Sequence, residues 1–456
     1  PHTSRYSLSK LGEALGLEEL GSHRALDDAV AAQALFVALL NLAAELPMAV
    51  LQEINRLSGR VDWALGDVFR DVERGLARTA FGGGIGQQLA AQLGTREEML
   101  GPLFATEQDT EELVRAARPR AVDAQELASM LEAGGTFARH FPGYEHRPQQ
   151  VEMLRAVAQA FNERQHLLVE AGTGVGKSIA YLLPAVAFAH LNSEPVLVST
   201  NTINLQDQLF LKDVPDLQNL LPFEFRAVVL KGRSNYLCQR RLAGLRQVGV
   251  SSPDEMRMLA KVLVWVPSTQ TGERGELFMP NRLEQALWSK ISAESETCTA
   301  DRCRYRERGR CFFYRARRAA ERAHLIIVNH ALLLSDVAVE NRVLPEYRYL
   351  IVDEAHHLEA TATRHLGLEL YQQQFLGSLQ ALDGGRGLIA DLGRSAREGA
   401  RAPAALDPLG NRVEHALSDA AKAVDVAGSF YDVLGEALSG MLTSQSGVNE
   451  LRLTQA

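Results

Sequence analysis

A glycine-rich turn between an apolar run and a helical pattern constrains this chain more than any other feature. The stretch LLVEAGTGVGKSIAYLLPAV joins an expected strand, His166–Val169, to an expected helix. Glycines let backbone N–H groups curve around phosphate oxygens, and a helix N-terminus favours the same anion. The sequence therefore predicts a phosphate loop, made of Ala171, Gly172, Thr173, Gly174, Val175, Gly176, Lys177 and Ser178.

Two residues of this loop are expected to carry chemistry. Lys177 would reach the β- and γ-phosphates of ATP, and Ser178 would hold Mg²⁺. The first position of the loop is Ala171 and not glycine, so the strict pattern fails at one residue. The alternative is an ordinary glycine-rich turn, and it leaves the Gly-Lys-Ser run at a helix start unexplained.

An acidic pair follows a second apolar run, in YRYLIVDEAHHLE. Asp353 stands where the expected strand ends and could reach the Mg²⁺, while Glu354 could polarise the attacking water. His356 would couple the nucleotide state to the rest of the protein. The alternatives are that the acids mark a helix start, where they are favoured, and that His356 is a helix cap.

The fold class is predicted by the alternation of short β-rich runs with helical patterns from about residue 137 onward. Such alternation indicates an α/β domain with a parallel sheet. About ninety residues between the third and fourth runs hold all four cysteines, which is too many for a loop and predicts an inserted subdomain. The five runs are His166–Val169, Val196–Ser199, Arg226–Leu230, Leu325–Val328 and Tyr349–Val352.

Composition excludes several classes of protein. The net charge of −8 does not by itself indicate a nucleic-acid binder, so any such surface must be local. Four cysteines are too few for a disulfide scaffold. The most apolar stretch, Ala34–Leu51, contains Asn41, Glu45 and Pro47, which predicts a buried helix followed by a break and not a membrane span. No signal peptide is visible, so the expected location is cytoplasmic.

The phosphate loop and the DEAH run resemble those of superfamily 2 helicases of the DEAH kind. Two further stretches are similar to that family. YEHRPQQ carries Arg147 and Gln150 about twenty residues before the loop, where the family has a nucleotide-sensing glutamine. In VLVSTNTINLQDQL an expected strand ends at Ser199-Thr200 and is followed by a polar helix start, where the family contacts the DNA backbone. Taken alone, each is equally an ordinary loop or helix cap.

The cysteines are unevenly spaced. Cys238 is followed after fifty-nine residues by Cys298, after four more by Cys303 and after seven more by Cys311. Disulfides are not expected in the cytosol. A four-cysteine zinc site usually has two close pairs, an iron–sulfur cluster also takes four thiolates, and unrelated free thiols are the simplest alternative. Spacing alone leaves zinc and iron open.

The position of the cysteines between the two nucleotide motifs favours one of these two metals. A four-cysteine insertion between the phosphate loop and the DEAH strand resembles the DinG/XPD-like helicases, as do KGRSNYLC, TGERGEL (Thr271–Leu277) and IIVNHALLL (Ile326–Leu334). The resemblance implies a RecA-like P-loop motor domain and 5′-to-3′ unwinding of single-stranded or forked DNA by a monomeric motor driven by ATP and Mg²⁺. It also implies a [4Fe–4S] cluster on Cys238, Cys298, Cys303 and Cys311.

The run from Asp301 to Arg322 is basic, with nine arginines and three acids, a local net charge of +6. Arginine binds phosphate and aromatic rings stack on bases, so the run predicts a single-strand surface beside the cluster. The alternative is a solvated helix face with aromatic residues in a core. The interleaved aromatic residues are Tyr305, Phe312, Phe313 and Tyr314.

The N-terminal stretch GSHRALDDAVAAQALF places His23, Ala25 and Asp28 in an H-x-A-x-x-D arrangement. A histidine could deprotonate water while the aspartate binds a metal. This resembles the last motif of DnaQ-like 3′-to-5′ exonucleases, whose earlier acidic motif would precede Pro1. The chain is therefore expected to be a fragment without exonuclease activity. No second motor domain with an arginine finger is found, so slow ATP turnover is also expected.

Five regions are predicted from these patterns. They are an exonuclease remnant (1–45), a helical connector (46–135), the first RecA-like domain (136–235 and 324–360), the iron–sulfur insertion (236–323) and a truncated helical arch-like region (361–456). Two other functions stay open. One is a parent that acts mainly as an exonuclease with an ATP-controlled regulator. The other is a non-catalytic DNA-binding module with a zinc or cluster staple.

Overall fold

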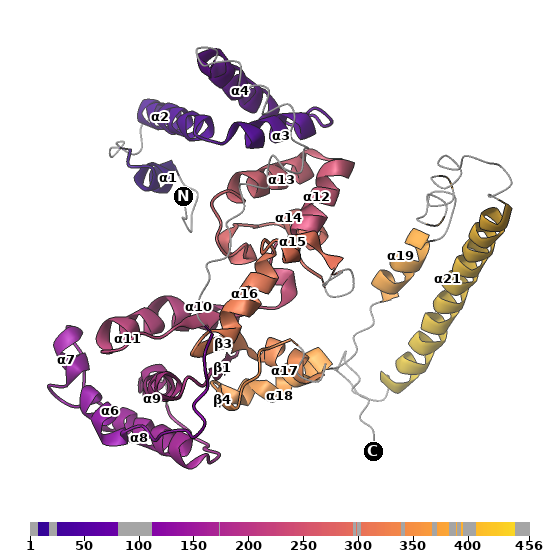
Figure 1. Cartoon of the computed structure of the whole chain (residues 1–456). Coiled ribbons are helices and arrows are strands. Elements are labelled where there is room, and N and C mark those ends of the chain that lie inside the picture. Colours follow the sequence, from indigo (N-terminus) through magenta and orange to yellow (C-terminus); the bar gives the residue numbers. More distant parts are fainter. Residues whose placement is uncertain are drawn as a thin grey trace. The chain divides into compact units, whose positions relative to one another are not determined.

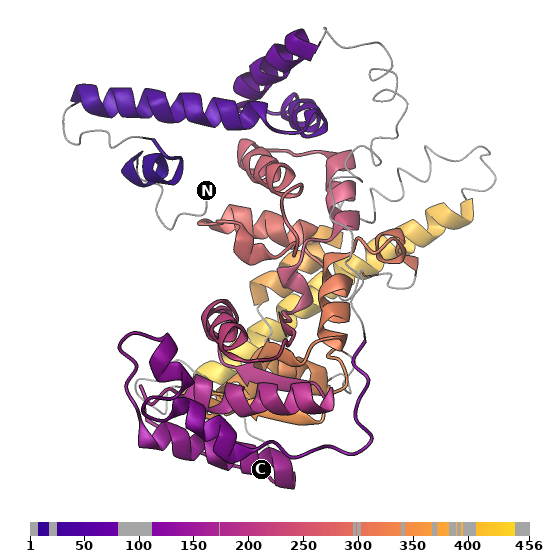
Figure 2. The same ribbon diagram turned by 60° about the vertical axis from the view of Figure 1, so that its left-hand side comes forward.

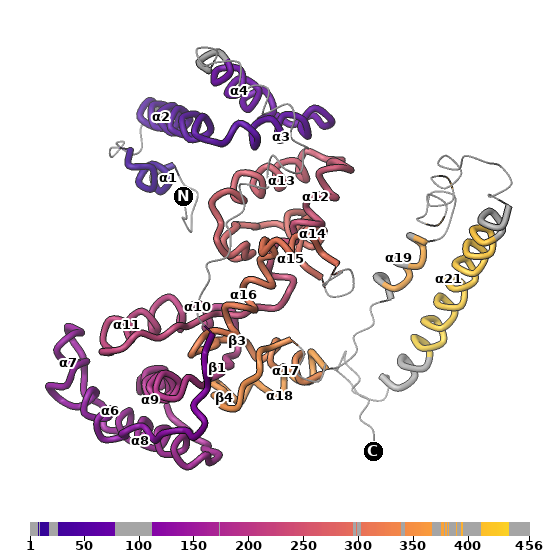
Figure 3. The backbone as a smooth tube through the Cα atoms, in the orientation of Figure 1, coloured from indigo at the N-terminus to yellow at the C-terminus, as the bar shows by residue number. Residues whose placement is uncertain are grey.

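The structure is a computed structural model that divides into two compact units, residues 1–365 and 366–456. Figure 3 traces the backbone of both. The described residues are 8–17, 25–80, 112–172, 174–294, 298, 302–338, 343–366, 372–382, 389, 394 and 407–442.

The first unit contains a four-stranded parallel sheet (Figure 1), in the order β2-β3-β1-β4. The central strand β1 is buried along its whole length. It pairs with β3 on one side, Val198 opposite Ile327, and with β4 on the other, Val198 opposite Ile351. The predicted α/β class with a parallel sheet is confirmed. The strands are β1 (Val196–Thr200), β2 (Ala227–Val229), β3 (Leu325–Asn329) and β4 (Tyr349–Val352).

The prediction of a strand at His166–Val169 is wrong for this structure. These residues adopt no regular structure, and Leu168 is 94% exposed. A strand exists only where a neighbour completes its hydrogen-bond ladder. Among the described residues β4 has one neighbour, β1, so the segment before the phosphate loop is apolar but unpaired.

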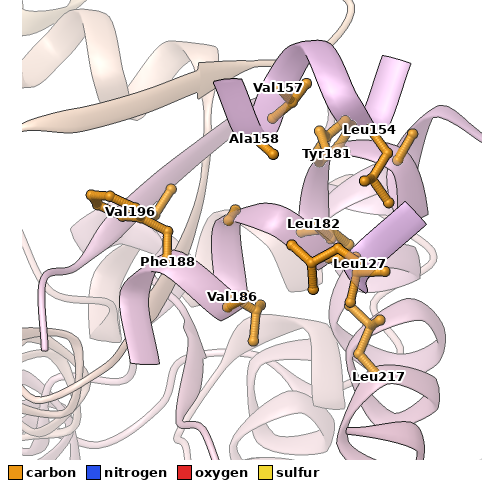
Figure 4. Packing of buried hydrophobic residues seen from close by; sticks show 14 of the residues in the cluster. Leu127, Leu154, Val157, Ala158, Tyr181, Leu182, Val186, Phe188, Val196 and Leu217 are labelled. Atoms are coloured by element: carbon orange, nitrogen blue, oxygen red, sulfur yellow. The ribbon is translucent and has the colours of Figure 1, made fainter. Parts of the chain in front are cut away.

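Helices cover the sheet and supply most of its core. Helix α9 is apolar on nearly every side, and its residues from Ala180 to Ala189 are buried, as expected for a helix packed between other layers. Figure 4 shows Tyr181, Leu182 and Phe188 of α9 among residues of α6, α8, β1 and α11. The helices of this region are α6 (Ala124–Leu131), α7 (Thr136–His140), α8 (Pro148–Glu163), α9 (Lys177–Asn192), α10 (Ile203–Gln208), η2 (Leu209–Asp213), α11 (Val214–Leu220), α17 (His330–Ala338), η6 (Ala355–His357) and α18 (Leu358–Leu366).

The residues between β2 and β3 form a helical lobe with a hydrophobic core of its own, centred on Tyr236, Trp288, Phe312 and Phe313. The chain leaves the sheet after β2 and returns along α16, which packs against β2 (Figure 1). The elements of this lobe are η3 (Arg233–Asn235), α12 (Gln239–Val248), α13 (Pro253–Trp265), η4 (Arg274–Glu276), α14 (Arg282–Ile291), α15 (Arg304–Glu307) and α16 (Phe312–Glu321).

The N-terminal helices extend this second core. Helix α3 packs against α13 (Figures 1 and 2) and buries Ile54 and Leu57 there. Glu53 is buried and accepts hydrogen bonds from Arg246 of α12 at 2.7 Å and from Arg56. Burial opposes but does not prevent a lowered pKa of Glu53, because both guanidinium groups favour its charged form. The helices are α1 (Leu8–Ala14), α2 (Ala25–Ala44), α3 (Met48–Ser58) and α4 (Gly66–Ala80).

The predicted break at Pro47 is confirmed, since α2 ends at Ala44 and α3 begins at Met48. The predicted burial of the apolar helix is wrong. Residues Leu26–Ala44 are long and apolar enough to cross a membrane by length and composition, and 11% of that window is buried. Helix α2 mainly contacts α1 and α4, two short partners that leave Phe36 and Val37 about half exposed.

The second unit consists of helices α19 (Gln372–Leu382) and α21 (Asp407–Leu442), which pack against each other. Phe375 and Tyr431 meet edge to face, with 6.2 Å between ring centroids. The described part of this region is helical, as its sequence pattern predicts.

A buried histidine at the start of β3 gives the first unit a pH-dependent stability. The Arg226 N–H donates to Nδ1 of His324 at 3.1 Å, so the ring must be neutral at that atom. Burial lowers the pKa of His324 from 6.5 to about 4. Between these values the unfolded chain binds a proton that the folded chain does not. The free energy of unfolding should therefore fall by about 2 kcal/mol as the pH drops from 6.5 to 4, after allowance for solvent screening.

Chemical denaturation at several pH values tests this expectation. The His324→Asn variant keeps an acceptor for Arg226 but cannot titrate, so its stability should lose that part of the acid dependence. The His140→Asn variant, altered at an exposed histidine, should behave as wild type. Equal acid dependence in His324→Asn and wild type would contradict the assignment.

Candidate functional site

The glycine-rich loop leads directly into α9. Gly176 is the N-cap of this helix with a φ of +83°, and Gly174 has a φ of +81°. Both angles lie in the left-handed region that favours glycine. A Cβ on Gly176 would also collide with the Gln150 amide. The loop thus has a conformation that needs glycine at two positions, as the sequence pattern predicts.

Arg147 and Gln150 hold this loop from the start of α8. The Arg147 guanidinium donates to the Gly174 carbonyl, and the buried Gln150 amide donates to the Gly176 carbonyl at 2.9 Å. Arg147 also pairs with Glu145 at 3.2 Å. The structure therefore brings both of these sequence-predicted residues to the loop.

Lys177 meets the acidic strand end across 177 positions of the chain. Its Nζ lies 3.1 Å from Oε1 of Glu354, and the two side chains are 27% and 30% exposed. The hydrogen bond from Lys177 lowers the pKa of Glu354, which keeps this carboxylate ionised. The Lys177 ammonium thus faces the Glu354 carboxylate, which is suited to act as a general base, and both side chains are partly exposed to solvent.

Asp353 is held by a tyrosine that sequence reasoning missed. The buried Tyr181 of α9 donates its hydroxyl to Oδ2 of Asp353 at 3.1 Å. Burial raises the pKa of Asp353, and the Tyr181 hydrogen bond opposes that shift. The Asp353 backbone N–H donates to the Ser199 carbonyl at 2.8 Å, which fixes the end of β4 against β1.

The backbone turns sharply just after Asp353. Glu354 has a φ of +53°, a left-handed conformation that is uncommon for residues other than glycine and clusters at functional sites. His356 is largely exposed, and its Nδ1 lies 3.6 Å from Oε2 of Glu354. Its ring packs beside that of His357, with centroids 4.0 Å apart. The structure therefore places His356 next to the acidic pair.

Ser178 has two polar neighbours. Its hydroxyl interacts with Tyr181 and with Asp213 of η2. Asp213 is 8% exposed, and its Oδ2 has no hydrogen-bond partner among the described residues. Burial raises the pKa of this carboxyl group, and Ser178 opposes the shift. Sequence reasoning missed Asp213. The stretch of sequence that could have pointed to it is LKDVPDL.

The stretch with the predicted DNA contact begins with two buried strand residues. Ser199 and Thr200 are fully buried, so their side chains do not face a DNA backbone. Ser199 is instead hydrogen-bonded to Nδ1 of the buried His330 at 2.8 Å. The exposed residues start at Thr202, which caps α10 by accepting from the Leu205 N–H at 3.2 Å.

The four cysteines come together in the helical lobe. Cys238, Cys303 and Cys311 each stand immediately before a helix, α12, α15 and α16. Burial, with a smaller contribution from the other three thiols, raises the pKa of Cys311 to about 11. Among the described residues no group of three or more Cys, His, Asp or Glu side chains is arranged to hold a single metal ion.

The basic run is part of this cysteine region, but its aromatic residues divide. Phe312 and Phe313 are buried in the core of the lobe, so the prediction that they stack on bases is wrong. Both rings lie on the side of α16 that packs into this core. Tyr305 and Tyr314 are partly exposed and lie under guanidinium groups, with Arg306 4.2 Å from the Tyr314 centroid.

Three predicted site residues need separate mention. Asp28 lies in the first turn of α2 and is exposed. His23, its predicted partner, lies outside the described residues, and so does Thr173 of the phosphate loop. The exonuclease motif therefore stays a prediction.

Two family models match the chain. Residues 147–262 match the DEAD/DEAH box helicase family, and residues 280–375 match the DEAD_2 family. The first range includes the glycine loop and β1. The second includes Cys298, Cys303 and Cys311 together with the acidic end of β4.

Several characterised proteins are similar to the chain. "3'-5' exonuclease DinG" of Bacillus subtilis is 33% identical over 80% of the chain and 38% of its own length. "ATP-dependent DNA helicase YoaA" of Haemophilus influenzae is 34% identical over 55% of the chain and 39% of its own length. "ATP-dependent helicase DinG" of Mycobacterium tuberculosis is 39% identical over 49% and 36%. The chain thus spans less than two fifths of each of these relatives.

Proposed function

We propose that this chain is the ATP-binding part of a DinG-like, ATP-dependent DNA helicase. The observation that carries the proposal is the meeting of Lys177 with Glu354 at 3.1 Å, beside Asp353 and Ser178. A lysine at a helix start, a hydroxyl and two carboxylates at a strand end are the groups that phosphoryl transfer from ATP requires. The names of the helicase relatives and the DEAD/DEAH box match support the same reaction.

Each group has a role in this proposal. Lys177 leaves Glu354 to bind the β- and γ-phosphates of ATP, together with the N–H groups of the glycine loop. Ser178 and Asp353 hold Mg²⁺, which offsets the phosphate charge. Glu354, whose carboxylate is released when Lys177 moves to the phosphates, then orients and deprotonates the attacking water. Gln150 and Arg147 set the shape of the loop, and His356 passes on the nucleotide state.

The four cysteines fit an iron–sulfur cluster better than a zinc ion. A tetrahedral zinc site, with Zn–S distances near 2.3 Å, brings its sulfur atoms within roughly 4 Å of one another. The thiols interact electrostatically with Cys311 without forming such a single-ion group. A four-iron cluster is larger and separates its thiolates more widely. The cluster would hold the lobe rigid.

Single-stranded or forked DNA is the proposed substrate, with unwinding in the 5′-to-3′ direction. Exposed guanidinium groups of the basic run, those of Arg302, Arg304 and Arg308, can bind phosphates. The buried Lys231 joins this lobe to α10, since it pairs with Glu273 at 2.8 Å and with Asp207 at 3.0 Å. A cytoplasmic location and a monomeric motor belong to the same proposal.

A second function is favoured by one specific observation. The Bacillus subtilis relative, which matches four fifths of the chain, is named an exonuclease. The parent could therefore digest DNA from the 3′ end, with the ATP site as its regulator. In that case ATP would change nuclease activity without any strand separation.

A strand-displacement assay distinguishes these functions. A polypeptide that contains residues 1–456 in full should displace the labelled strand of a 5′-tailed fork in the presence of Mg-ATP, and a 3′-tailed fork much more slowly. Labels at both ends of the displaced strand report digestion in the same reaction. Displacement of intact strand supports the helicase. ATP-dependent shortening without displacement supports the regulated exonuclease. If neither displacement nor shortening occurs, the proposal has no support.

A further inference from the structure

The nucleotide site contains a third carboxylate whose position is not explained by packing. Asp213 is 8% exposed and lies at the end of η2, on the stretch between β1 and β2. Its side chain has Ser178 and Asp353 as polar neighbours. Among the described residues its Oδ2 has no partner. Burying a carboxylate without a full set of partners is costly, and such groups persist where function requires them.

A helix-cap role does not account for this residue. Asp213 has helical backbone angles and lies inside a helix that continues from α10 through η2 into α11, so its carboxylate does not stand at a free helix start. In this structure its side chain makes no cap hydrogen bond. Capping therefore does not explain why a carboxylate is buried at this position.

The local backbone explains why the carboxylate faces the loop. Residues Leu209–Asp213 form a π-helical turn, and the Val214 N–H donates to the Leu209 carbonyl, five residues back. Pro215 follows and cannot donate a helical hydrogen bond, so a regular α-helix would be interrupted here in any case. The wider turn changes the direction of the side chain at its end. Such turns occur often at functional sites.

We propose that Asp213 is a positioning residue of the nucleotide–metal site, which accepts one hydrogen bond from the Ser178 hydroxyl and another from the hydration shell of the bound cation. This inference rests on the proposed ATP-binding function. With its proton directed at Asp213, the Ser178 hydroxyl turns a lone pair toward the cation. Asp213 thus acts through Ser178 and water, and it touches neither the phosphates nor the nucleobase of ATP.

The role predicts a loss confined to metal-dependent binding. In Asp213→Asn, the affinity for Mg-ATP should fall about tenfold, the usual effect of losing one hydrogen bond to a charged group. The affinity for ATP in excess EDTA should change by less than about twofold. The melting temperature of the nucleotide-free chain should not fall, because the variant removes a buried charge.

Isothermal titration calorimetry on this chain, with and without Mg²⁺, measures both affinities. Asp216→Asn is the matched control, because Asp216 lies one turn later on α11 and is half-buried; it should bind as wild type. Equal Mg-ATP affinity in Asp213→Asn and wild type would overturn the inference. A parallel loss of both affinities with a lower melting temperature would show a structural role and also overturn it. A wild-type chain that binds no ATP would instead remove the proposed function itself.

Discussion

Replacing Lys177 with alanine should abolish tight binding of Mg-ATP while leaving the fold intact. Lys177 contributes a charge at the phosphate position, and the loss of charge-assisted hydrogen bonds of this kind weakens binding about 10- to 100-fold. Any ATP hydrolysis should fall further, by about 10²- to 10³-fold, as when a group that stabilises transition-state charge is removed. The stability should change by less than about 1 kcal/mol, because the Lys177–Glu354 pair is partly exposed.

Calorimetry for binding and phosphate release for hydrolysis check this prediction. Glu354→Gln removes the partner of Lys177 but keeps the ammonium group, so it should retain Mg-ATP binding and lose hydrolysis. Lys212→Ala, altered at an exposed lysine near the site, should match wild type. If Lys177→Ala bound Mg-ATP as tightly as wild type, the glycine loop would not be the phosphate site.

The sequence predicted the part of the site that lies in one contiguous run of residues. The loop from Ala171 to Ser178 depends on glycine conformations at fixed spacing, and Gly174 and Gly176 indeed have positive φ angles. The sequence also predicted that the acidic end of β4 reaches this loop, and Lys177 indeed meets Glu354.

The residues that sequence reasoning missed act across the fold. Tyr181 reads as one more apolar residue of α9, and only the packing of α9 beside β4 brings its hydroxyl to Asp353. Asp213 depends on a π-helical turn that no periodicity announces. His330 lies in a stretch that was noted for its resemblance, but its bond to Ser199 crosses from α17 to β1.

The two main errors in the fold also have physical causes. The apolar run at His166–Val169 has the composition of a strand, but composition cannot supply the neighbour that a ladder needs. Phe312 and Phe313 lie within an arginine-rich run of the sequence, yet α16 turns both rings into the core beside Tyr236. In each case the local composition was described correctly, but contacts with other parts of the chain determined the structure.

Replacing Cys303 with serine should remove all iron from the chain and loosen the helical lobe. Purified without oxygen, the wild type should contain about four irons per chain and absorb broadly in the visible range. In the proposed cluster, four thiolates would join α12, α15 and α16 and restrain a lobe whose ligand-bearing segment is rich in arginine, so loss of one ligand should release the others. Iron and zinc analysis with a visible spectrum measures the first effect.

Tryptophan fluorescence measures the second effect with unusual selectivity. The chain has three tryptophans; Trp265 and Trp288 are in the core of the lobe, and Trp63 packs against it. Cys303→Ser should therefore shift the emission to longer wavelength, while Mg-ATP affinity stays within about twofold because the nucleotide site belongs to the other core. Tyr305→Phe, a conservative change on α15, should keep both iron and emission. One zinc per chain without iron would replace the cluster with a structural zinc ion. A metal-free wild type whose emission matches that of Cys303→Ser would refute ligation altogether.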